Sequence, residues 1–426
     1  MFVNNFIFSN HDTVELARKY GTPLYVLSED IITSNAEIMK NAFEKCNIDY
    51  EINYAGKAFL TVAMCKIIEN AGLSLDVVSG GELYTAIKAG FPMERVCFHG
   101  SNKSIAEIEM AFDYKVGKVV ADSEYELGVL DRIAEEKKYT PKVMVRVSPG
   151  IEAHTHEYVQ TGRIDSKFGV PLKLMGKVLS DVCKFSNLNI IGLHCHIGSQ
   201  IFDEKPFLIA AETMLKLMKG LEENGFEMKQ LNLGGGFGIP YLKDDSVFDI
   251  DEYVQKLVEF AKDKCRELGL EFPKLLVEPG RFIVGTAGVT LYEIGTVKEI
   301  PHTRKYVSVD GGMADNPRPG LYDALYHAVV ANKMTFSDED EELVTVSGRC
   351  CETDTLITDV LLPKCEAGDI LAVLNTGAYN YSMSSNYNRL PKPAVVLLKG
   401  DKDQVIVERE TYEDIVSKDR LPNWYK

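Results

Sequence analysis

Two short motifs carry side chains that could do chemistry where a strand-like apolar run ends. In NYAGKAF, Lys57 stands at such a place. A lysine there is often only a solvated charge, but partial desolvation lowers the pKa of its amine and makes it a Schiff-base nucleophile. In EPGRF, Glu278 and Arg281 flank a Pro-Gly turn. This pair is either a salt-bridged turn or a carboxylate that keeps a heterocyclic nitrogen protonated beside an arginine that is available for an anion.

A third motif, LNLGGGFG, places Gly234, Gly235 and Gly236 after another strand-like run. Consecutive glycines allow backbone N–H groups to approach an anion closely. The motif lacks the Lys-Ser/Thr of a P-loop and the spacing of a dinucleotide fingerprint. It therefore predicts either a tight turn or a site for a monophosphate.

The motif GLHCHIGSQ contains His194, Cys195 and His196, which raises the question of a metal. In a strand the two histidines share one face and the cysteine points to the other, so three ligands from this stretch have poor geometry. We expect no metal. An imidazole stacked on an aromatic cofactor, with Ser199 near a phosphate, is the better interpretation.

Much later in the chain, GRCCETD brings Cys350, Cys351 and Glu352 together. A thiol with a reference pKa near ~8.5 is mostly protonated at neutral pH, so it can donate a proton. The motif is far in sequence from the others, so only the fold can bring this thiol to them.

The elements that must position these residues alternate regularly. Between residues 51 and 284, eight apolar, β-branched runs alternate with stretches of helical periodicity. Such strands indicate a parallel sheet, and eight of them over roughly ~250 residues favour a closed (β/α)8 barrel over a doubly wound open sheet. The polar residues that fall at or just past the ends of these strands, the face where barrel enzymes carry their sites, are Lys57, His99, Asp122, Arg146, His196, Gly234 and Glu278.

After about residue 285 the pattern changes to short strand-like runs with few long helices between them. This predicts a second, mostly β domain. The early run TPLYVLSE is also strand-like, and we expect it to pair with that later sheet. The predicted domains are a barrel at 36–284 and a β-rich domain made of 1–35 plus 285–426.

The composition argues against some kinds of binding partner. The chain has 426 residues and a formal net charge of −16. It has no basic run, which argues against a nucleic-acid partner. Its nine cysteines do not form a disulfide framework and favour a reducing compartment. We find no targeting signal and no apolar run long enough to span a membrane, so we expect a cytoplasmic protein without a membrane partner.

The chain resembles the fold-type III pyridoxal-phosphate decarboxylases in seven motifs, which occur in the order NYAGKA, HGSNKS, GLHCHIGSQ, LNLGGGFG, EPGR, CETD and GAYNYSMSSNYNRLPKP. Each motif is weak alone, but their joint occurrence covers nearly the whole chain. The resemblance implies a (β/α)8 barrel of the alanine-racemase type with a second, mostly β domain. It also implies pyridoxal 5'-phosphate as the cofactor.

The resemblance assigns roles to the candidate residues. Lys57, His196 and Cys351 would be catalytic: the lysine bonded to the cofactor, the imidazole stacked on its ring, and the thiol protonating the α-carbon after carbon dioxide leaves. Related alanine racemases have an arginine in place of Glu278, so Glu278 favours decarboxylation over racemisation. The residues implied to bind the cofactor are Lys57, His196, Ser199, Gly234, Gly235, Gly236, Glu278, Gly280, Arg281 and Tyr379.

Two further stretches, 153–169 and 316–324, resemble the family members that convert meso-2,6-diaminopimelate to L-lysine. An arginine and a carboxylate suit the distal carboxylate and distal ammonium of that substrate. The loop 154–162 would close over it. The family's sites are shared across a homodimer interface, which would bring the cysteine into the partner's barrel. The residues implied to bind substrate are Arg281, Arg318, Tyr322, Glu352 and Tyr379.

Some residues depart from the family pattern, and other functions stay open. Gly56 and Phe59 replace the valine and asparagine of the usual lysine motif, and Cys350 adds a second thiol. These changes could alter cofactor orientation or substrate range. The alternatives are a decarboxylase of ornithine, arginine or carboxynorspermidine, a non-catalytic pyridoxal-phosphate-binding protein, and, most distantly, a metal-dependent barrel hydrolase. Arg318 has a use only if the far end of the substrate is an anion.

Overall fold

The chain forms two compact units in a computed structural model that describes residues 5–151, 166–176, 178, 184–335 and 341–425. The barrel unit consists of Thr33–Ile239 and Ser246–Ile283. The β-rich unit consists of Met1–Ile32, Pro240–Asp245 and Val284–Lys426. The stretch 154–162, predicted to close over substrate, lies outside the described residues.

Eight parallel strands form the closed barrel that the sequence predicted. They follow in chain order around the ring, and β12 pairs with β4 to close it. The strands are β4 (Tyr50–Ala55), β5 (Ser74–Val77), β6 (Val96–Phe98), β7 (Lys118–Ala121), β8 (Lys142–Ser148), β10 (Asn189–His194), β11 (Gln230–Asn232) and β12 (Lys274–Val277). A short strand, β9 (Val170–Pro171), pairs with the end of β8.

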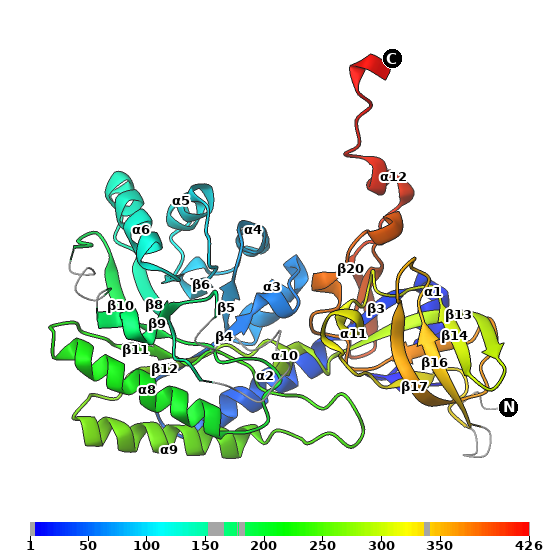
Figure 1. The fold of residues 1–426 in the computed structure, drawn as a ribbon, viewed down its shortest axis with the longest axis horizontal. Helices are drawn as coiled ribbons and strands as arrows, with labels where there is room; N and C mark the ends of the chain where they lie inside the picture. The colour runs from blue at the N-terminus through cyan, green and yellow to red at the C-terminus, as the bar shows by residue number, and fades with distance from the viewer. Residues whose placement is uncertain (1–4, 152–165, 177, 179–183, 336–340, 426) are drawn as a thin grey trace. The chain divides into compact units, whose positions relative to one another are not determined.

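Helices surround this ring of strands, and α8 and α9 run side by side (Figure 1). Side-chain caps begin many of them: Ser79, for example, accepts from the Glu82 amide at the start of α4, and Gly90 ends that helix in the left-handed conformation. The barrel-unit helices are α2 (Glu29–Glu44), α3 (Val62–Asn70), α4 (Gly80–Ala89), α5 (Ile105–Asp113), α6 (Glu124–Lys137), α8 (Lys205–Glu222), α9 (Ile250–Leu268) and α10 (Arg281–Val284). None of the helices in the described part of the chain has the length and apolar character needed to cross a membrane.

The β-rich unit is built on one long strand, β13 (Gly288–Ile300), which pairs with three neighbours. One of them is β3 (Leu24–Ser28), which also pairs with β19. The prediction that TPLYVLSE joins the later sheet is therefore confirmed. The other strands of this sheet are β14 (Arg304–Val309), β15 (Ala328–Val330), β16 (Glu341–Ser347), β17 (Thr355–Pro363), β18 (Ile370–Val373), β19 (Ala394–Lys399) and β20 (Lys402–Val407).

Short elements complete the β-rich unit. A two-stranded ribbon at the N-terminal end leads into a capped helix, and two more short helices occur late in the chain. These elements are β1 (Ile7–Phe8), β2 (His11–Asp12), α1 (Thr13–Tyr20), α11 (Arg318–Tyr322) and α12 (Tyr412–Val416). Pro240–Asp245 lies within the barrel's stretch of sequence but packs with this unit, where the Asn375 amide donates to the Pro240 carbonyl at 2.9 Å.

The polar residues predicted at the strand ends lie at that end of the barrel. Lys57, His99 and Glu278 follow the last residues of β4, β6 and β12. Arg146 precedes the end of β8 by two residues, but it is in register with His194, the last residue of β10, and its Nη1 lies 3.7 Å from Asp122 Oδ1.

We expect Gly192 in β10 to be essential for barrel closure. A Cβ at this position would lie 2.1 Å from the Gln230 carbonyl oxygen, so Gly192→Ala should force β10 and β11 apart and destabilise the barrel by about 3 kcal/mol. Gly220→Ala is the matched control, because nothing lies within 4 Å of a Cβ there and alanine favours a helix by about 1 kcal/mol. Thermal unfolding of both variants checks this, and equal melting temperatures would contradict it.

Candidate active site

Lys57 lies in a single 3-10 turn, η1 (Gly56–Ala58), directly after β4. A Cβ on Gly56 would lie 2.9 Å from the Asp76 carbonyl oxygen, so the close approach of β5 accounts for a glycine before the lysine. The Lys57 side chain itself is exposed. The sequence left open a solvated or a partly desolvated amine, and within one chain Lys57 is solvated.

Glu278 is a buried carboxylate that three side chains from other strands contact. Its Oε1 lies 2.9 Å from His99 Nε2 and accepts from Asn232 Nδ2 at 2.6 Å. Its Oε2 lies 3.1 Å from His194 Nε2. Because an ionised carboxylate can only accept hydrogen bonds, both imidazoles must carry a proton on Nε2. The carboxylate is thus fixed in orientation from three sides.

The charge state of this cluster follows from burial and these contacts. Burial disfavours the ionised form of Glu278, but the imidazoles of His99 and His194 outweigh it and hold the pKa of Glu278 well below its ordinary value. Burial lowers the pKa of His194 to about 4, against the opposing effect of Glu278. Burial, and then the charge of Glu278, raise the pKa of the neighbouring Asp76 well above its ordinary value. These contacts therefore favour the ionised form of Glu278, whereas burial shifts Asp76 toward its neutral form.

The glycine loop lies against the backbone of Glu278. The Glu278 amide donates to the Gly234 carbonyl at 2.8 Å, and a Cβ on Gly235 would lie only 2.0 Å from the Glu278 carbonyl oxygen. Gly234 and Gly236 have φ of +72° and +112°, which other residues rarely adopt. The three glycines therefore form a backbone cradle with no room for side chains of its own, which allows the close approach that an anion site uses.

His196, Ser199 and Arg281 lie at the same end of the barrel. The Gly235 amide donates to His196 Nδ1 at 3.2 Å, which directs the half-buried ring across the glycine loop. Burial, and then the charge of Lys57, lower the pKa of His196 well below its ordinary value. Arg281, at the start of α10, donates from Nη2 to Ser199 Oγ at 2.9 Å. These groups offer a neutral ring, a hydroxyl and a cation beside the cradle.

Cys97, His99 and Glu278 form the one group of three potential metal-ligating side chains within the described ranges. The Cys97 sulfur lies 3.3 Å from His99 Nε2. Burial raises the pKa of the Cys97 thiol well above its ordinary value, so the thiolate that would bind a metal is disfavoured. Since Glu278 already accepts from three side chains, we interpret the group as part of the carboxylate network.

Arg318 begins α11 and is buried in the β-rich unit. Its guanidinium donates to the Tyr241 hydroxyl at 3.1 Å and to the Tyr326 hydroxyl. It also lies over both rings, 5.2 and 5.5 Å from their centroids. Burial opposes the charge, but the two tyrosines outweigh it and raise the pKa of Arg318 above its ordinary value. Arg318 is therefore a fixed and permanent cation.

Tyr322 and Tyr379, also in the β-rich unit, are both half-buried. Tyr322 ends α11, four residues after Arg318. Tyr379 has a φ of +64° in a loop that leads into the fully buried Asn380. The Asn380 side-chain amide lies 3.2 Å from the Tyr326 hydroxyl, so one tyrosine connects Arg318 to the loop that carries Tyr379.

Cys351 and Glu352 lie exposed in the turn between β16 and β17. Asp354 ends this turn and is buried. Its carboxylate accepts from the backbone N–H groups of Cys350 at 2.8 Å and of Met313 at 2.6 Å. The sequence did not single out Asp354 for any role, yet it is the residue that fixes the base of this turn.

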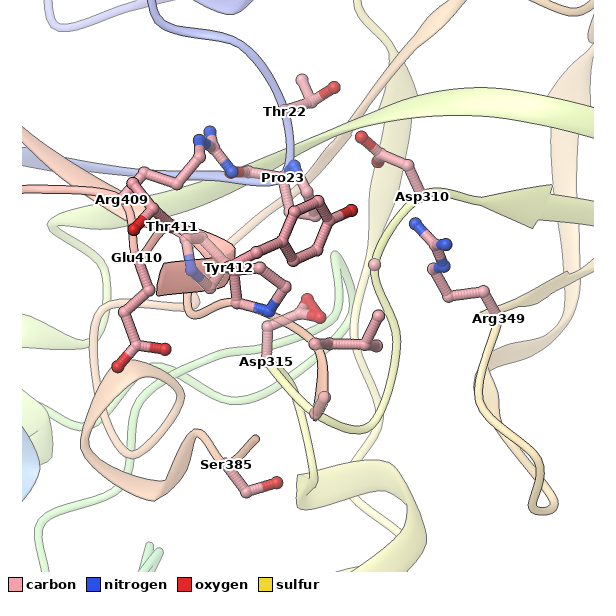
Figure 2. A pocket seen from close by; sticks show the side chains of 15 residues that line it. Thr22, Pro23, Asp310, Asp315, Arg349, Ser385, Arg409, Glu410, Thr411 and Tyr412 are labelled. Atoms are coloured by element: carbon pink, nitrogen blue, oxygen red, sulfur yellow. The ribbon is translucent and has the colours of Figure 1, made fainter. Parts of the chain in front are cut away.

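A pocket of about 390 Å³ lies beside this turn in the β-rich unit (Figure 2). Arg349 and Asp310 line one side of it, and Arg409 lies on the other. Arg409 is already engaged, because it donates to the carbonyls of Gly21 and Pro23 at 3.0 and 2.8 Å. No residue predicted to bind cofactor or substrate lines this pocket.

The predicted site residues thus fall into two groups, one in each unit. The barrel unit brings together Lys57, His196, Ser199, Gly234, Gly235, Gly236, Glu278, Gly280 and Arg281. The β-rich unit carries Arg318, Tyr322, Cys351, Glu352 and Tyr379. Sequence reasoning missed the roles of His194 and Asn232. Both are the last residues of their strands, β10 and β11, so a polar residue at a strand end was the available signal.

The barrel is that of the pyridoxal-dependent decarboxylases. Residues 29–285 match the family described as "Pyridoxal-dependent decarboxylase, pyridoxal binding domain". This confirms pyridoxal phosphate as the cofactor and decarboxylation as the class of reaction, both of which the motifs predicted.

Similarity to individual proteins identifies one branch of this family. The chain is 47% identical to the diaminopimelate decarboxylase of Bacillus subtilis over 96% of this chain and 93% of that protein. It is 44% identical to that of Staphylococcus aureus over 95% of each. The crystal structure of diaminopimelate decarboxylase from M. jannaschii in co-complex with L-lysine matches with a TM-score of 0.91 and 35% identity, over 99% of this chain and 97% of that one. The chain belongs to the diaminopimelate decarboxylase family.

The barrel site fits a phosphorylated pyridine. The glycine loop has no room for a Cβ at Gly235, so its backbone can approach a ligand closely, although the Gly234 and Gly235 amides already donate to Asn232 Oδ1 and His196 Nδ1. The ionised, buried Glu278 can accept from a protonated ring nitrogen. Lys57 is an exposed amine at the end of β4, accessible to an aldehyde. The barrel unit therefore supplies a carboxylate for the ring nitrogen, an amine for the aldehyde and, in Arg281 beside Ser199, a cation for the phosphate.

We expect the stability of the barrel to fall as the pH falls from 6.5 to about 4, the ordinary and folded pKa values of His194. The unfolded chain binds a proton at His194 throughout that window and the folded chain does not, so acid favours unfolding. His194→Gln should weaken the pH dependence of thermal unfolding. His302→Asn, an exposed histidine in the β-rich unit, should leave it unchanged. The same slope in all three proteins would contradict the role of His194.

Proposed function

We propose that this chain catalyses the pyridoxal-phosphate-dependent decarboxylation of meso-2,6-diaminopimelate to L-lysine and carbon dioxide, the last step of lysine biosynthesis. The observation that carries this proposal is the full-length likeness to proteins named diaminopimelate decarboxylase. The likeness to a structure in co-complex with L-lysine supports the same reaction, since lysine would be the product.

The barrel residues would hold and tune the cofactor. When bound, pyridoxal phosphate accepts the electron pair left behind by departing carbon dioxide. Lys57 would provide the amine that attaches it, and His196 would lie against its ring. Glu278 would keep the ring nitrogen protonated, because its own negative charge is fixed by His99 and His194. The phosphate would be held by Ser199, Gly234, Gly235, Gly236 and Tyr379, and Gly280 and Arg281 would also bind the cofactor.

The ends of the substrate would be distinguished by charge. Together with Arg281 and Tyr322, Arg318 would bind the distal carboxylate. Its contacts with two tyrosines hold the guanidinium in one orientation, which suits a two-point contact with a carboxylate. Glu352 would bind the distal ammonium. A substrate without a distal anion, such as ornithine, would leave the buried Arg318 without a counter-charge.

Cys351 would supply the proton to the α-carbon. After the carbon–carboxylate bond breaks, the thiol gives its proton to that carbon and later regains one from water. The neighbouring Cys350 is a poorer candidate for cycling between thiol and thiolate, because burial and then Asp354 raise its pKa to about 11. Cys351 is exposed and Cys350 is half-buried, which also favours Cys351.

The active form would be a cytoplasmic homodimer with sites shared across its interface. The exposure of Cys351 and Glu352 suits a turn that reaches into the barrel of a partner. All eight cysteines in the described residues are unpaired, as expected in a reducing compartment. In this proposal residues 36–284 bind the cofactor, and residues 1–35 with 285–426 supply the thiol and the groups for the distal end of the substrate.

The first test is carbon dioxide release by the purified, cofactor-loaded protein. We expect strong preference for meso-diaminopimelate over ornithine, arginine and carboxynorspermidine, because only diaminopimelate has a distal carboxylate for Arg318. A preference for one of the other three would preserve the decarboxylase class and overturn the assignment of Arg318. Inactivity with all four would favour a non-catalytic binding protein.

A mixing experiment tests the shared site. Lys57→Ala and Cys351→Ala should each be inactive or severely slowed alone. After the two variants are unfolded and refolded together, half of the dimers are mixed and each has one intact site, so about a quarter of the activity should return. Cys350→Ala, mixed with Lys57→Ala in the same way, should be active before and after mixing. No recovery in the first mixture would contradict a site shared between subunits.

A further inference from the structure

The segment Ser385–Arg389, within the motif SSNYNR, lies directly against the turn that carries Cys351 and Glu352. The backbone N–H of Cys351 donates to Asn388 Oδ1 at 3.0 Å. The hydroxyl of Tyr387 donates to Glu352 Oε1 at 2.8 Å. Two consecutive residues of this segment therefore contact two consecutive residues of the turn.

The segment is itself well anchored. The Ser385 amide donates to the Ala314 carbonyl at 2.8 Å. At its other end, Arg389 donates to Asp419 Oδ2 at 2.8 Å and to the Ile415 carbonyl at 3.0 Å, in and after helix α12. Because the segment is held at both ends, its side chains can hold the adjacent exposed turn in one position.

The backbone of the segment is adapted to these contacts. Asn388 has a φ of +51°, a conformation that asparagine tolerates better than most residues. This conformation is uncommon, and such residues persist where the surrounding structure requires them. The contact with Cys351 gives a reason for it here.

We infer that Asn388 and Tyr387 are positioning residues for the reaction: Asn388 fixes the place of Cys351, and Tyr387 orients Glu352 and so sets the preference for a substrate with a distal ammonium. The inference rests on the proposed function, which gives Cys351 and Glu352 their roles. Within the motif, Asn388 positions the proton donor Cys351, and the preceding residue, Tyr387, positions the substrate-binding residue Glu352.

Because these contacts are exposed to water, they can orient side chains while contributing little to the stability of the fold. Glu352 is exposed and Tyr387 is half-exposed, so the hydrogen bond between them competes with water and contributes little to folding. Without the hydroxyl, the Glu352 side chain would sample several rotamers and lose entropy when it binds an ammonium group. Removal of this hydroxyl should therefore weaken substrate binding and leave the fold intact.

The experiment uses the cofactor-loaded protein and two ligands, meso-diaminopimelate and 2-aminopimelate, which keeps the distal carboxylate but has no distal ammonium. In Tyr387→Phe we expect KM for diaminopimelate to rise about fivefold. The inhibition constant of 2-aminopimelate, kcat and the melting temperature should not change. Tyr412→Phe, which removes the hydroxyl of another exposed tyrosine in the β-rich unit, should match the unmodified protein.

The variant Glu352→Gln distinguishes an error in the positioning role of Tyr387 from an error in the proposed role of Glu352. If Glu352→Gln raises KM for diaminopimelate alone and Tyr387→Phe does not, the positioning role of Tyr387 is wrong and the function stands. If Glu352→Gln affects diaminopimelate and 2-aminopimelate equally, the role of Glu352 in the proposed function is wrong, and the role of Tyr387 fails with it.

Asn388 is tested by a pair of variants. Asn388→Ala should lower kcat about tenfold through misplacement of Cys351, with KM little changed. In D2O it should also yield lysine with mixed stereochemistry of deuterium at the carbon that lost carbon dioxide. Asn388→Asp keeps an acceptor oxygen and should restore most of the rate and a single stereochemistry. Equal losses in both variants, or a single stereochemistry in Asn388→Ala, would overturn the role of Asn388.

Discussion

A buried negative charge on Glu278 is the constraint on which the barrel site depends. An ionised carboxylate inside a protein costs several kcal/mol unless other groups compensate it. Here the compensation comes from His99, His194 and Asn232, which belong to or follow three different strands. Each donor must lie within hydrogen-bond distance of Glu278. The ends of β6, β10, β11 and β12 therefore have to be aligned with one another. The closed barrel provides that alignment.

The same carboxylate links the two ends of the cofactor site. Glu278 contacts the glycine loop through its backbone and the histidines through its side chain. A shift of the loop would therefore move the carboxylate, since Gly235 approaches the Glu278 carbonyl too closely for any Cβ. The distance between the glycine loop and the Glu278 carboxylate is thus set by a backbone hydrogen bond and close backbone packing between the ends of β11 and β12. A rigid planar cofactor requires that kind of fixed spacing.

The sequence predicted the parts of this structure that depend on local pattern. Apolar runs identified all eight barrel strands, and the polar residues that follow them identified Lys57, His196 and Glu278. It did not reveal the partners of Glu278, because His194 is 84 residues away from it and a strand pattern does not report which side chains meet inside a barrel. Nor could it decide between a solvated and a partly desolvated Lys57, because that depends on what covers the amine in three dimensions. Asp354 was missed because a buried carboxylate that binds backbone N–H groups has no distinctive spacing.

The two units hold their candidate functional side chains in position through physically different contacts. In the barrel, position and stability are coupled, because loss of any donor to Glu278 leaves a buried charge undercompensated. In the β-rich unit, Cys351 and Glu352 lie on an exposed turn, and Asn388 and Tyr387 hold them through contacts that water can replace. In the proposed function, changes at the exposed contacts would alter substrate preference without loss of the fold, whereas changes around Glu278 would also cost stability. The partner of the ring nitrogen would thus lie in the part of the chain that tolerates least variation, and the proton donor and the contact with the distal ammonium in the part that tolerates more.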